Sequence, residues 1–317
     1  MTEYTHNPVM LNEVLSFVPA QSENTLYIDC NTGEGGHSYA FLSENPVVRL
    51  VCIDADNNIL EIAKKRLHSF SNRIYFYNGW SYDFFADYPH ELKKPDFILF
   101  DLGISTYHYK KSGKGFSFDK EEYLDMRLDK ESGISAAELI ARLPEKELAD
   151  LIYNNAEERY SRRIASKIVN ERQKSTITTT SALAALVENA VPASYRHGHI
   201  HPATRTFQAL RIAVNGELSK LLSLLEGALR VLEPGGRLGV ISFHSLEDRI
   251  IKNFFKASNK NCICPAHAPI CRCEGRRSVK ILTKKGITPG NEEIERNPPS
   301  RSARLRVVEK VLEEDGQ

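Results

Sequence analysis

A glycine-rich loop, GEGGHS, occupies residues 33–38, between an apolar run and a segment of helical character. Glycine is required where the backbone takes a positive φ or where another group approaches the main chain closely. A G-x-G-x-x-S pattern after a strand and before a helix is typical of loops that bind nucleoside-bearing cofactors. The sequence has no G-x-x-x-x-G-K-[ST] motif, which argues against a phosphate-loop nucleoside triphosphatase.

Asp54 follows Gly33 by 21 residues, at the end of the next apolar run. A carboxylate at this position of a strand–helix–strand unit can accept hydrogen bonds from both hydroxyl groups of a ribose. The loop and Asp54 together predict a ribose-bearing cofactor, for which NAD and S-adenosylmethionine are the two candidates. The alternative is a tight turn followed by an ordinary surface aspartate.

Two more carboxylates, Asp29 and Asp101, stand at the ends of the first and fourth apolar runs. The charge of Asp29 would repel the pyrophosphate of NAD, whereas it would attract the ammonium group of S-adenosylmethionine. Asp101 adds a carboxylate at the same expected edge of the sheet, where ligands of such folds bind. Carboxylates at successive strand ends suit a cationic ligand, so the charges favour S-adenosylmethionine.

The elements that must position these residues alternate between strands and helices in the first hundred residues. After residue 131 helical patterns dominate to about 198, and a long helix is expected near 204–232, before strand patterns resume. This order predicts an α/β fold interrupted by an α-helical insertion. The expected strands are 26–30, 49–56, 73–79, 96–100, 236–243, 280–285 and 303–311. The expected parts are a first portion of the α/β domain (1–105), a helical substrate-recognition insertion (106–204), and a second portion with a basic C-terminal segment (205–317).

Charge is distributed unevenly along a chain whose net charge is only +1. Residues 249–306 contain 14 Lys and Arg against 4 Glu. Such a basic segment indicates a polyanionic partner such as nucleic acid, with a solvated charged surface as the alternative. No apolar stretch is long enough to span a membrane and no secretory signal precedes the domain, so we expect a soluble cytoplasmic protein.

Four of the six cysteines form a C-x-C-x6-C-x-C pattern at Cys262, Cys264, Cys271 and Cys273. Four thiolates can bind zinc tetrahedrally, although this spacing is tighter than the usual C-x2-C. Zinc there would pin a basic loop, and no metal is expected in the catalytic site. A second local pattern, HSLEDR at 244–249, predicts a helix capped by Ser245 with Asp248 as its capping-box partner.

Ten segments spread over nearly the whole chain carry a family resemblance. They are NPVMLNEVL (7–15), YID-x3-GEGGHS (27–38), CIDAD (52–56), FDLGIS (100–105), GFSF (115–118), LDMRLD (124–129), AEERYSRRIA (156–165), HPATRTFQALRIAVN (201–215), EPGGRLGVISFHSLEDRIIK (233–252) and NPPSRSARLRVVEK (297–310). This set resembles the bacterial 16S ribosomal RNA cytosine-N4 methyltransferases, often called MraW or RsmH. The resemblance implies a class I (Rossmann-like) methyltransferase fold with an inserted helical domain, S-adenosylmethionine as cofactor, and a decoding-centre cytidine of 16S rRNA in the small ribosomal subunit as substrate.

The family's cofactor contacts, carried over by resemblance, fall on seven positions of this chain. Trp80 takes an aromatic position that could lie against adenine, and His108 stands where the family usually has Gln. Residues 30–32, CNT, also depart from the commoner small-Thr-aromatic run. The seven positions are Gly35, Gly36, His37, Asp54, Trp80, Asp101 and His108.

Methyl transfer to an exocyclic amine is an in-line displacement that requires neither a metal nor a covalent intermediate. Asp101 is the candidate catalytic residue, as an acceptor for the amine proton, although it could instead only bind the cofactor. RNA contacts are expected from the basic C-terminal segment and from Arg127, Arg159, Arg162 and Arg163 of the insertion. An NAD-dependent dehydrogenase and a non-catalytic RNA-binding protein are the alternative functions, and monomer and homodimer both stay open.

Overall fold

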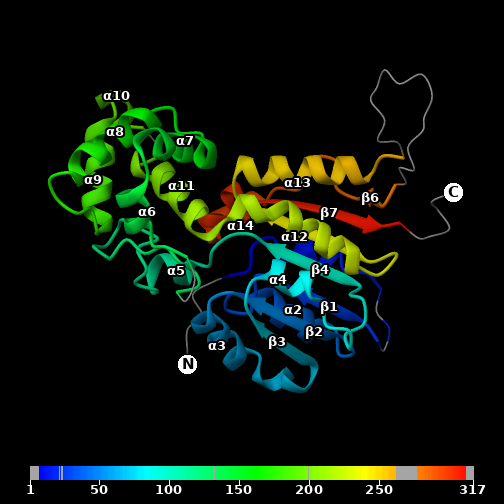
Figure 1. Cartoon of the computed structure of the whole chain (residues 1–317). Helices are drawn as coiled ribbons and strands as arrows, with labels where there is room; N and C mark the ends of the chain where they lie inside the picture. Colours follow the sequence, from blue (N-terminus) through cyan, green and yellow to red (C-terminus); the bar gives the residue numbers. More distant parts are fainter. Residues whose placement is uncertain are drawn as a thin grey trace, which may run out of the picture. The chain divides into compact units, whose positions relative to one another are not determined.

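The computed structural model describes residues 7–20, 22, 24–130, 133–198, 200–261 and 277–311. The chain forms two compact units, each of which is coloured by sequence in Figure 1. The first unit combines the chain up to Ile104 with the chain from Lys220 onward, and the second unit comprises Ser105–Ser219. The cysteine pattern at 262–273 lies outside the described residues, so the predicted zinc site stays a prediction.

The first unit is built on a seven-stranded sheet of order β3-β2-β1-β4-β5-β7-β6. Its neighbouring strands run parallel except for β7, which is antiparallel to both β5 and β6. This is the strand order of a class I, Rossmann-like methyltransferase, and the predicted fold class is confirmed. The strands are β1 Leu26–Asp29, β2 Arg49–Asp54, β3 Ile74–Asn78, β4 Phe97–Asp101, β5 Arg237–Ser242, β6 Val279–Ile281 and β7 Arg304–Lys310.

Helices cover both faces of this sheet, because successive side chains of each central strand point to opposite sides and both sides are apolar. Ile28 and Ile53 lie in one core with α4 (Ser81–Ala86), α12 (Glu217–Val231) and α13 (Ser245–Ser258). On the other face Tyr27 packs edge to face against Phe41 and Phe97. That core also contains α1 (Leu11–Ser16), α2 (Gly36–Glu44) and α3 (Asn57–Arg66). Three-layer packing of this kind leaves the strand ends as the place where polar side chains can gather.

Shorter elements complete the first unit. A 3-10 helix, η1 (His68–Arg73), leads into β3, and α14 (Asn291–Arg296) with η2 (Pro298–Ser302) precedes β7. Over the described ranges, no helix combines the length and the apolar character that crossing a bilayer would need.

The second unit is helical. Apolar side chains of α7, α8 and α11, including Ile152, Ile164 and Leu210, are buried in its interior. Its helices are α5 Thr106–Lys110, α6 Ala136–Arg142, α7 Glu145–Ala156, α8 Ser161–Arg172, α9 Thr180–Ala190, α10 Ala193–Arg196 and α11 Ala203–Asn215. This content agrees with the helical patterns of the sequence after residue 131.

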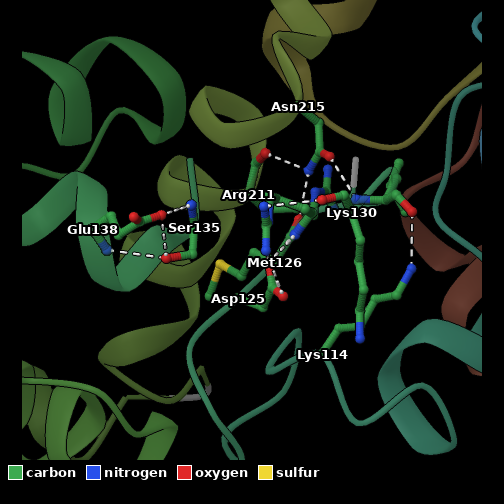
Figure 2. A network of polar contacts seen from close by, with 10 residues as sticks. Lys114, Asp125, Met126, Lys130, Ser135, Glu138, Arg211 and Asn215 are labelled. Carbon is green, nitrogen blue, oxygen red and sulfur yellow. Dashed lines mark hydrogen bonds and ion pairs between the residues drawn. The ribbon is translucent and has the colours of Figure 1, made fainter. Parts of the chain in front are cut away.

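A polar network holds the glycine- and charge-rich segment of the second unit in place (Figure 2). The Asn215 amide donates to the Met126 carbonyl (2.8 Å) and accepts from the Leu128 amide (2.9 Å). Lys114 Nζ donates to the Leu128 carbonyl, 2.8 Å away. The LDMRLD segment is therefore fixed by the C-terminal end of α11 and not by regular secondary structure of its own.

The long helix expected near 204–232 is instead two helices. Gly216 takes a left-handed conformation, with φ of 65°, that ends α11, and α12 begins at Glu217. The insertion was expected to end at residue 204, whereas the second unit extends to Ser219. The difference arises because α11 packs against α7 and α9, so its apolar face belongs to the helical core.

Candidate active site

Three aspartates stand at the carboxyl ends of neighbouring parallel strands. Asp29 ends β1, Asp54 ends β2 and Asp101 ends β4, and β1 lies between the other two strands. The carboxyl ends of parallel strands meet at one edge of a sheet, where such folds bind their ligands. The structure therefore brings together the carboxylates that the sequence predicts for a cofactor site.

The loop after β1 has the backbone that its glycines suggest. Gly33 and Gly35 take left-handed conformations, with φ of 55° and 78°. A Cβ atom added to Gly35 would lie 3.2 Å from the Leu67 side chain, and one added to Gly36 would lie 3.1 Å from the ring of Pro8. Small residues here let the N-terminal end of α2 approach both neighbouring segments closely.

Asp54 fixes this loop as well as ending β2. Its Oδ2 accepts from the Gly33 amide and its Oδ1 accepts from the Asp56 amide, both at 2.9 Å. The side chain is only partly buried, and each carboxylate oxygen has a second lone pair. Asp54 can therefore accept from a ribose diol while its orientation is held by the backbone of the loop.

Asp29 is a buried carboxyl group with one oxygen hydrogen-bonded. The Ser38 hydroxyl donates to Asp29 Oδ2 at 2.6 Å, and Oδ1 has no hydrogen-bond partner in the described part of the chain. Burial raises the pKa of Asp29 to about 6, although the Ser38 bond counteracts part of this effect. A buried acceptor without a donor is a feature that a ligand with donors would satisfy.

Asp101 is also a buried carboxyl group, and its pKa is raised further than that of Asp29. It is 8% exposed, and its Oδ1 is also without a hydrogen-bond partner among the described residues. Burial raises its pKa to about 8, and the negative charges of Asp29 and Glu247 act in the same direction. Its Oδ2 lies 3.8 Å from Nδ1 of His37, which comes from the first turn of α2. The two orphaned carboxyl oxygens of Asp29 and Asp101 fit a cationic donor such as an ammonium group.

Backbone and side-chain contacts tie Trp80 to the same strand ends. Trp80 directly precedes α4, and the amide of its neighbour Gly79 donates to the Asp54 carbonyl at 3.0 Å. The Ser81 hydroxyl donates to the Cys30 carbonyl at 2.6 Å. The segment that carries the indole is therefore anchored to the ends of both β1 and β2.

The indole of Trp80 has an aromatic and a cationic neighbour. It stacks on Tyr82 with the ring centroids 5.7 Å apart and the planes inclined by 22°. Nζ of Lys220, from α12, lies 5.3 Å from the Trp80 centroid and donates to the Tyr82 hydroxyl. Sequence reasoning missed Lys220, because no local pattern relates it to residues about 140 positions earlier.

His108, the remaining predicted cofactor contact, belongs to the second unit. It lies on α5, is 4% exposed, and its ring packs edge to face against Phe116 at a centroid distance of 5.4 Å. Within its own unit His108 is thus a packed side chain. Its cofactor contact stays a prediction.

The cap of α13 differs from the predicted one by a single residue. The N-cap is His244 and not Ser245: its side chain accepts from the Glu247 amide, and Glu247 Oε2 accepts from the His244 amide. Glu247, rather than Asp248, is therefore the capping-box partner. The Asp248 carboxylate instead accepts two hydrogen bonds from the Arg306 guanidinium, at 2.6 and 3.1 Å.

Comparisons with known proteins give named relatives that match most of the chain. A protein named ribosomal RNA small subunit methyltransferase H from Treponema denticola is 54% identical over 96% of this chain and 97% of its own length. One of the same name from Dehalococcoides mccartyi is 46% identical over 99% of this chain and 88% of its own. Among solved structures, an rRNA methylase from Streptococcus thermophilus is 11% identical and covers 95% of this chain and 92% of its own, with a TM-score of 0.39.

Family membership follows from a match that spans almost every residue. The sequence profile of the MraW methylase family matches residues 3–311, which include all the strand-end aspartates and the glycine loop. A dehydrogenase, considered as an alternative from the sequence, is thereby excluded. The chain belongs to the MraW methylase family.

Proposed function

We propose that this protein transfers a methyl group from S-adenosylmethionine to the exocyclic N4 amine of a decoding-centre cytidine of 16S rRNA in the small ribosomal subunit. The observation that carries the proposal is the pair of buried, orphaned carboxyl oxygens at the ends of β1 and β4, in a chain of the MraW methylase family. We also propose that it acts in the cytoplasm, where small subunits are found.

The cofactor residues have separate roles in this proposal. Asp29 and Asp101 hold the ammonium group of the cofactor, and Asp54 accepts from its ribose hydroxyls. The indole of Trp80 would contact the adenine, and Gly35, Gly36 and His37 would form the loop that holds the cofactor. The cofactor contact that the family resemblance implies for His108 stays a prediction. When bound, S-adenosylmethionine supplies a methyl group on a sulfonium centre.

The residues of the chain contribute mainly orientation to the transfer. Holding two reactants in line can lower a barrier by about 7–11 kcal/mol in the most favourable cases. The N4 amine of cytosine is a weak nucleophile because its lone pair is delocalised into the ring, so an acceptor near its N–H would assist the attack. We assign Asp101 to cofactor binding first, because its orphaned oxygen suits a cation. Its second role as a proton acceptor stays a prediction.

A methylation assay tests the proposed function. We expect the purified protein to transfer labelled methyl groups to small ribosomal subunits from a strain that lacks the enzyme, and the product nucleoside to be N4-methylcytidine by mass. Subunits from the parent strain, which are already methylated, should accept almost no label. If the RNA gains no label although both substrates are present, the result would support the alternative of a non-catalytic RNA-binding protein.

The second unit carries a surface suited to binding the RNA. Arg159 lies with its guanidinium 4.8 Å from the Tyr160 ring centroid and 4.9 Å from that of Tyr195. Glu158, which is fully buried, fixes both tyrosines, since it accepts from the Tyr195 hydroxyl (2.6 Å) and the Tyr160 amide (2.8 Å). Guanidinium and aromatic planes of this kind stack on bases that are splayed out of an RNA structure.

We expect Arg159→Ala to weaken binding of the small subunit by about 5- to 150-fold, since one base stack contributes roughly 1–3 kcal/mol. The affinity for S-adenosylmethionine should not change, because Arg159 is not among the proposed cofactor contacts. The measurement is the KM for subunits beside the calorimetric Kd for the cofactor. Arg142→Ala is the matched control, as Arg142 is an exposed arginine of the same unit that pairs only loosely with Glu138 at 3.4 Å. Equal KM values for the two variants would remove Arg159 from the RNA surface.

A further inference from the structure

The segment Asn7–Met10 packs against the start of α2. The ring of Pro8 lies so close to Gly36 that a Cβ atom there would be 3.1 Å away. Met10 is fully buried and takes φ of 54°, a left-handed conformation that residues other than glycine rarely adopt. Such a conformation persists only where the surrounding contacts determine it.

Both ends of the Val9–Met10 peptide group are hydrogen-bonded to side chains distant in sequence. The Met10 amide donates to Oε1 of Glu293, on α14, at 2.7 Å. The Val9 carbonyl accepts from Nε2 of His37 at 3.0 Å. Because the C=O of residue 9 and the N–H of residue 10 belong to one planar amide, a single peptide unit connects Glu293 with His37. A carboxylate on the N–H polarises the amide and strengthens its carbonyl as an acceptor.

This contact determines which nitrogen of His37 carries the proton. A carbonyl oxygen can only accept, so the hydrogen bond to Val9 places the proton on Nε2. In neutral His37 the lone pair then lies on Nδ1, which is the nitrogen 3.8 Å from Asp101 Oδ2. Neutral His37 thereby adds an acceptor nitrogen beside the carboxyl group of Asp101.

We propose that Glu293 is a positioning residue of the cofactor site, which acts through the Val9–Met10 peptide to hold His37 in the Nε2–H tautomer with Nδ1 directed at Asp101. The consequence for binding rests on the proposed function, since it assumes that the acceptors receive the ammonium group of S-adenosylmethionine. The tautomer itself does not depend on that function. Glu293 lies 283 residues after Met10, so the C-terminal segment takes part in shaping the cofactor loop.

The experiment compares Glu293→Ala and Glu293→Gln in the full chain, with histidines labelled by ¹⁵N and the His37 signals assigned from a His37→Gln sample. At a pH where the imidazole is neutral, we expect the ligand-free wild type to show a protonated Nε2 and an unprotonated Nδ1. Glu293→Gln keeps an oxygen that accepts from the Met10 amide, so it should preserve this tautomer and bind S-adenosylmethionine within about threefold of wild type. Glu293→Ala should give a mixture of tautomers and at least about tenfold weaker binding.

The matched control is Glu292→Ala. Glu292 is the preceding residue of the same short helix, and its side chain is 94% exposed. Its Oε2 lies 4.0 Å from Nη2 of Arg296. We expect wild-type spectra and affinity from this variant. A tautomer and an affinity in Glu293→Ala equal to those of Glu292→Ala would overturn the proposal.

Two further outcomes keep the test decisive. If Glu293→Ala does not fold, two other results can still overturn the proposal. One is a wild-type spectrum in which Nδ1 of His37 carries the proton. The other is a folded Glu293→Gln variant in which His37 has lost the Nε2–H tautomer. If the tautomer responds to Glu293 as expected but even the wild type binds no S-adenosylmethionine, the proposed function fails while the positioning role stands.

Discussion

Asp101→Asn is expected to weaken S-adenosylmethionine binding by roughly thirtyfold or more at pH 7.5, and methylation at limiting cofactor by a similar factor. The reason is that a buried carboxylate facing a cation is lost, and truncation of one member of such a pair costs about 2–5 kcal/mol. The measurement is the calorimetric Kd beside initial rates at several cofactor concentrations. Asp87→Asn, which changes an exposed acidic residue of the same unit, is the control and should behave as wild type.

The same substitution should change the proton balance of binding. The pKa of Asp101 is raised to about 8 in the ligand-free protein, so the group is mainly protonated at pH 7. An arriving cation stabilises the charged form, which lowers this pKa and releases a proton. Calorimetry at pH 7 in buffers of different ionisation enthalpy should therefore detect the release of close to one proton by wild type and clearly less by Asp101→Asn. Equal proton release would remove Asp101 from the ammonium site.

Without ligand, Asp101→Asn should have the opposite effect on stability. A carboxyl whose pKa is raised on folding binds more protons in the folded than in the unfolded state between pH 4 and about 8. The free energy of unfolding of the wild type therefore falls as the pH rises through this window. At pH 8.5 we expect the variant to be more stable than wild type by about 1 kcal/mol or more, and at pH 4 to differ little. Without ligand, the ionised Asp101 carboxylate would thus destabilise the folded protein, and the bound cation would remove this cost.

Arg306→Met should lower the free energy of unfolding of the first unit by about 2–4 kcal/mol. Arg306 is 5% exposed, and its guanidinium donates twice to Asp248, whose side chain is 20% exposed. Removal of one partner leaves a largely buried charge, which costs more than the ion pair contributed. The measurement is urea unfolding followed by the fluorescence of Trp80, the only tryptophan of the chain, which lies in the first unit.

Two variants separate the ion pair from general effects of losing an arginine. Arg301→Met changes an exposed arginine of the same C-terminal segment and should alter stability by less than about 0.5 kcal/mol. The double variant Arg306→Met with Asp248→Leu removes both charges and should recover most of the loss. A single Arg306→Met variant as stable as Arg301→Met would show that the pair contributes nothing to the fold.

This pair also changes the interpretation of the basic C-terminal segment. The sequence gives an excess of basic side chains over 249–306, from which phosphate contacts were expected. Arg306 is internal, and Arg304 lies 3.9 Å from the same Asp248 carboxylate. Arg306 therefore stabilises β7 against α13 and is not available to RNA. Charge counted along a sequence cannot separate these uses, because the burial of a side chain depends on the packing of the whole unit.

The sequence alone determined the elements and the chemical character of the site. Apolar runs of strand length mark the strands, and the runs that lead to the site end at an aspartate or are followed by glycines. These signals can be read from the sequence because side-chain alternation and turn chemistry are local properties. The strand ends of Asp29, Asp54 and Asp101 could therefore be predicted to meet. The cofactor contacts assigned to these residues and to His108 stay predictions.

Only the tertiary structure decided how these residues behave. The raised pKa of Asp101 arises from burial beside another carboxyl group, and the placement of Lys220 by Trp80 arises from the packing of α12. The proposed tautomer of His37 depends on the Val9–Met10 peptide, which Glu293 contacts. The end of the helical unit after α11, and not at residue 204, likewise follows from α11 joining the helical core. Each of these features depends on burial or on contacts between segments that are distant in the sequence, and a local sequence pattern reveals neither burial nor such contacts.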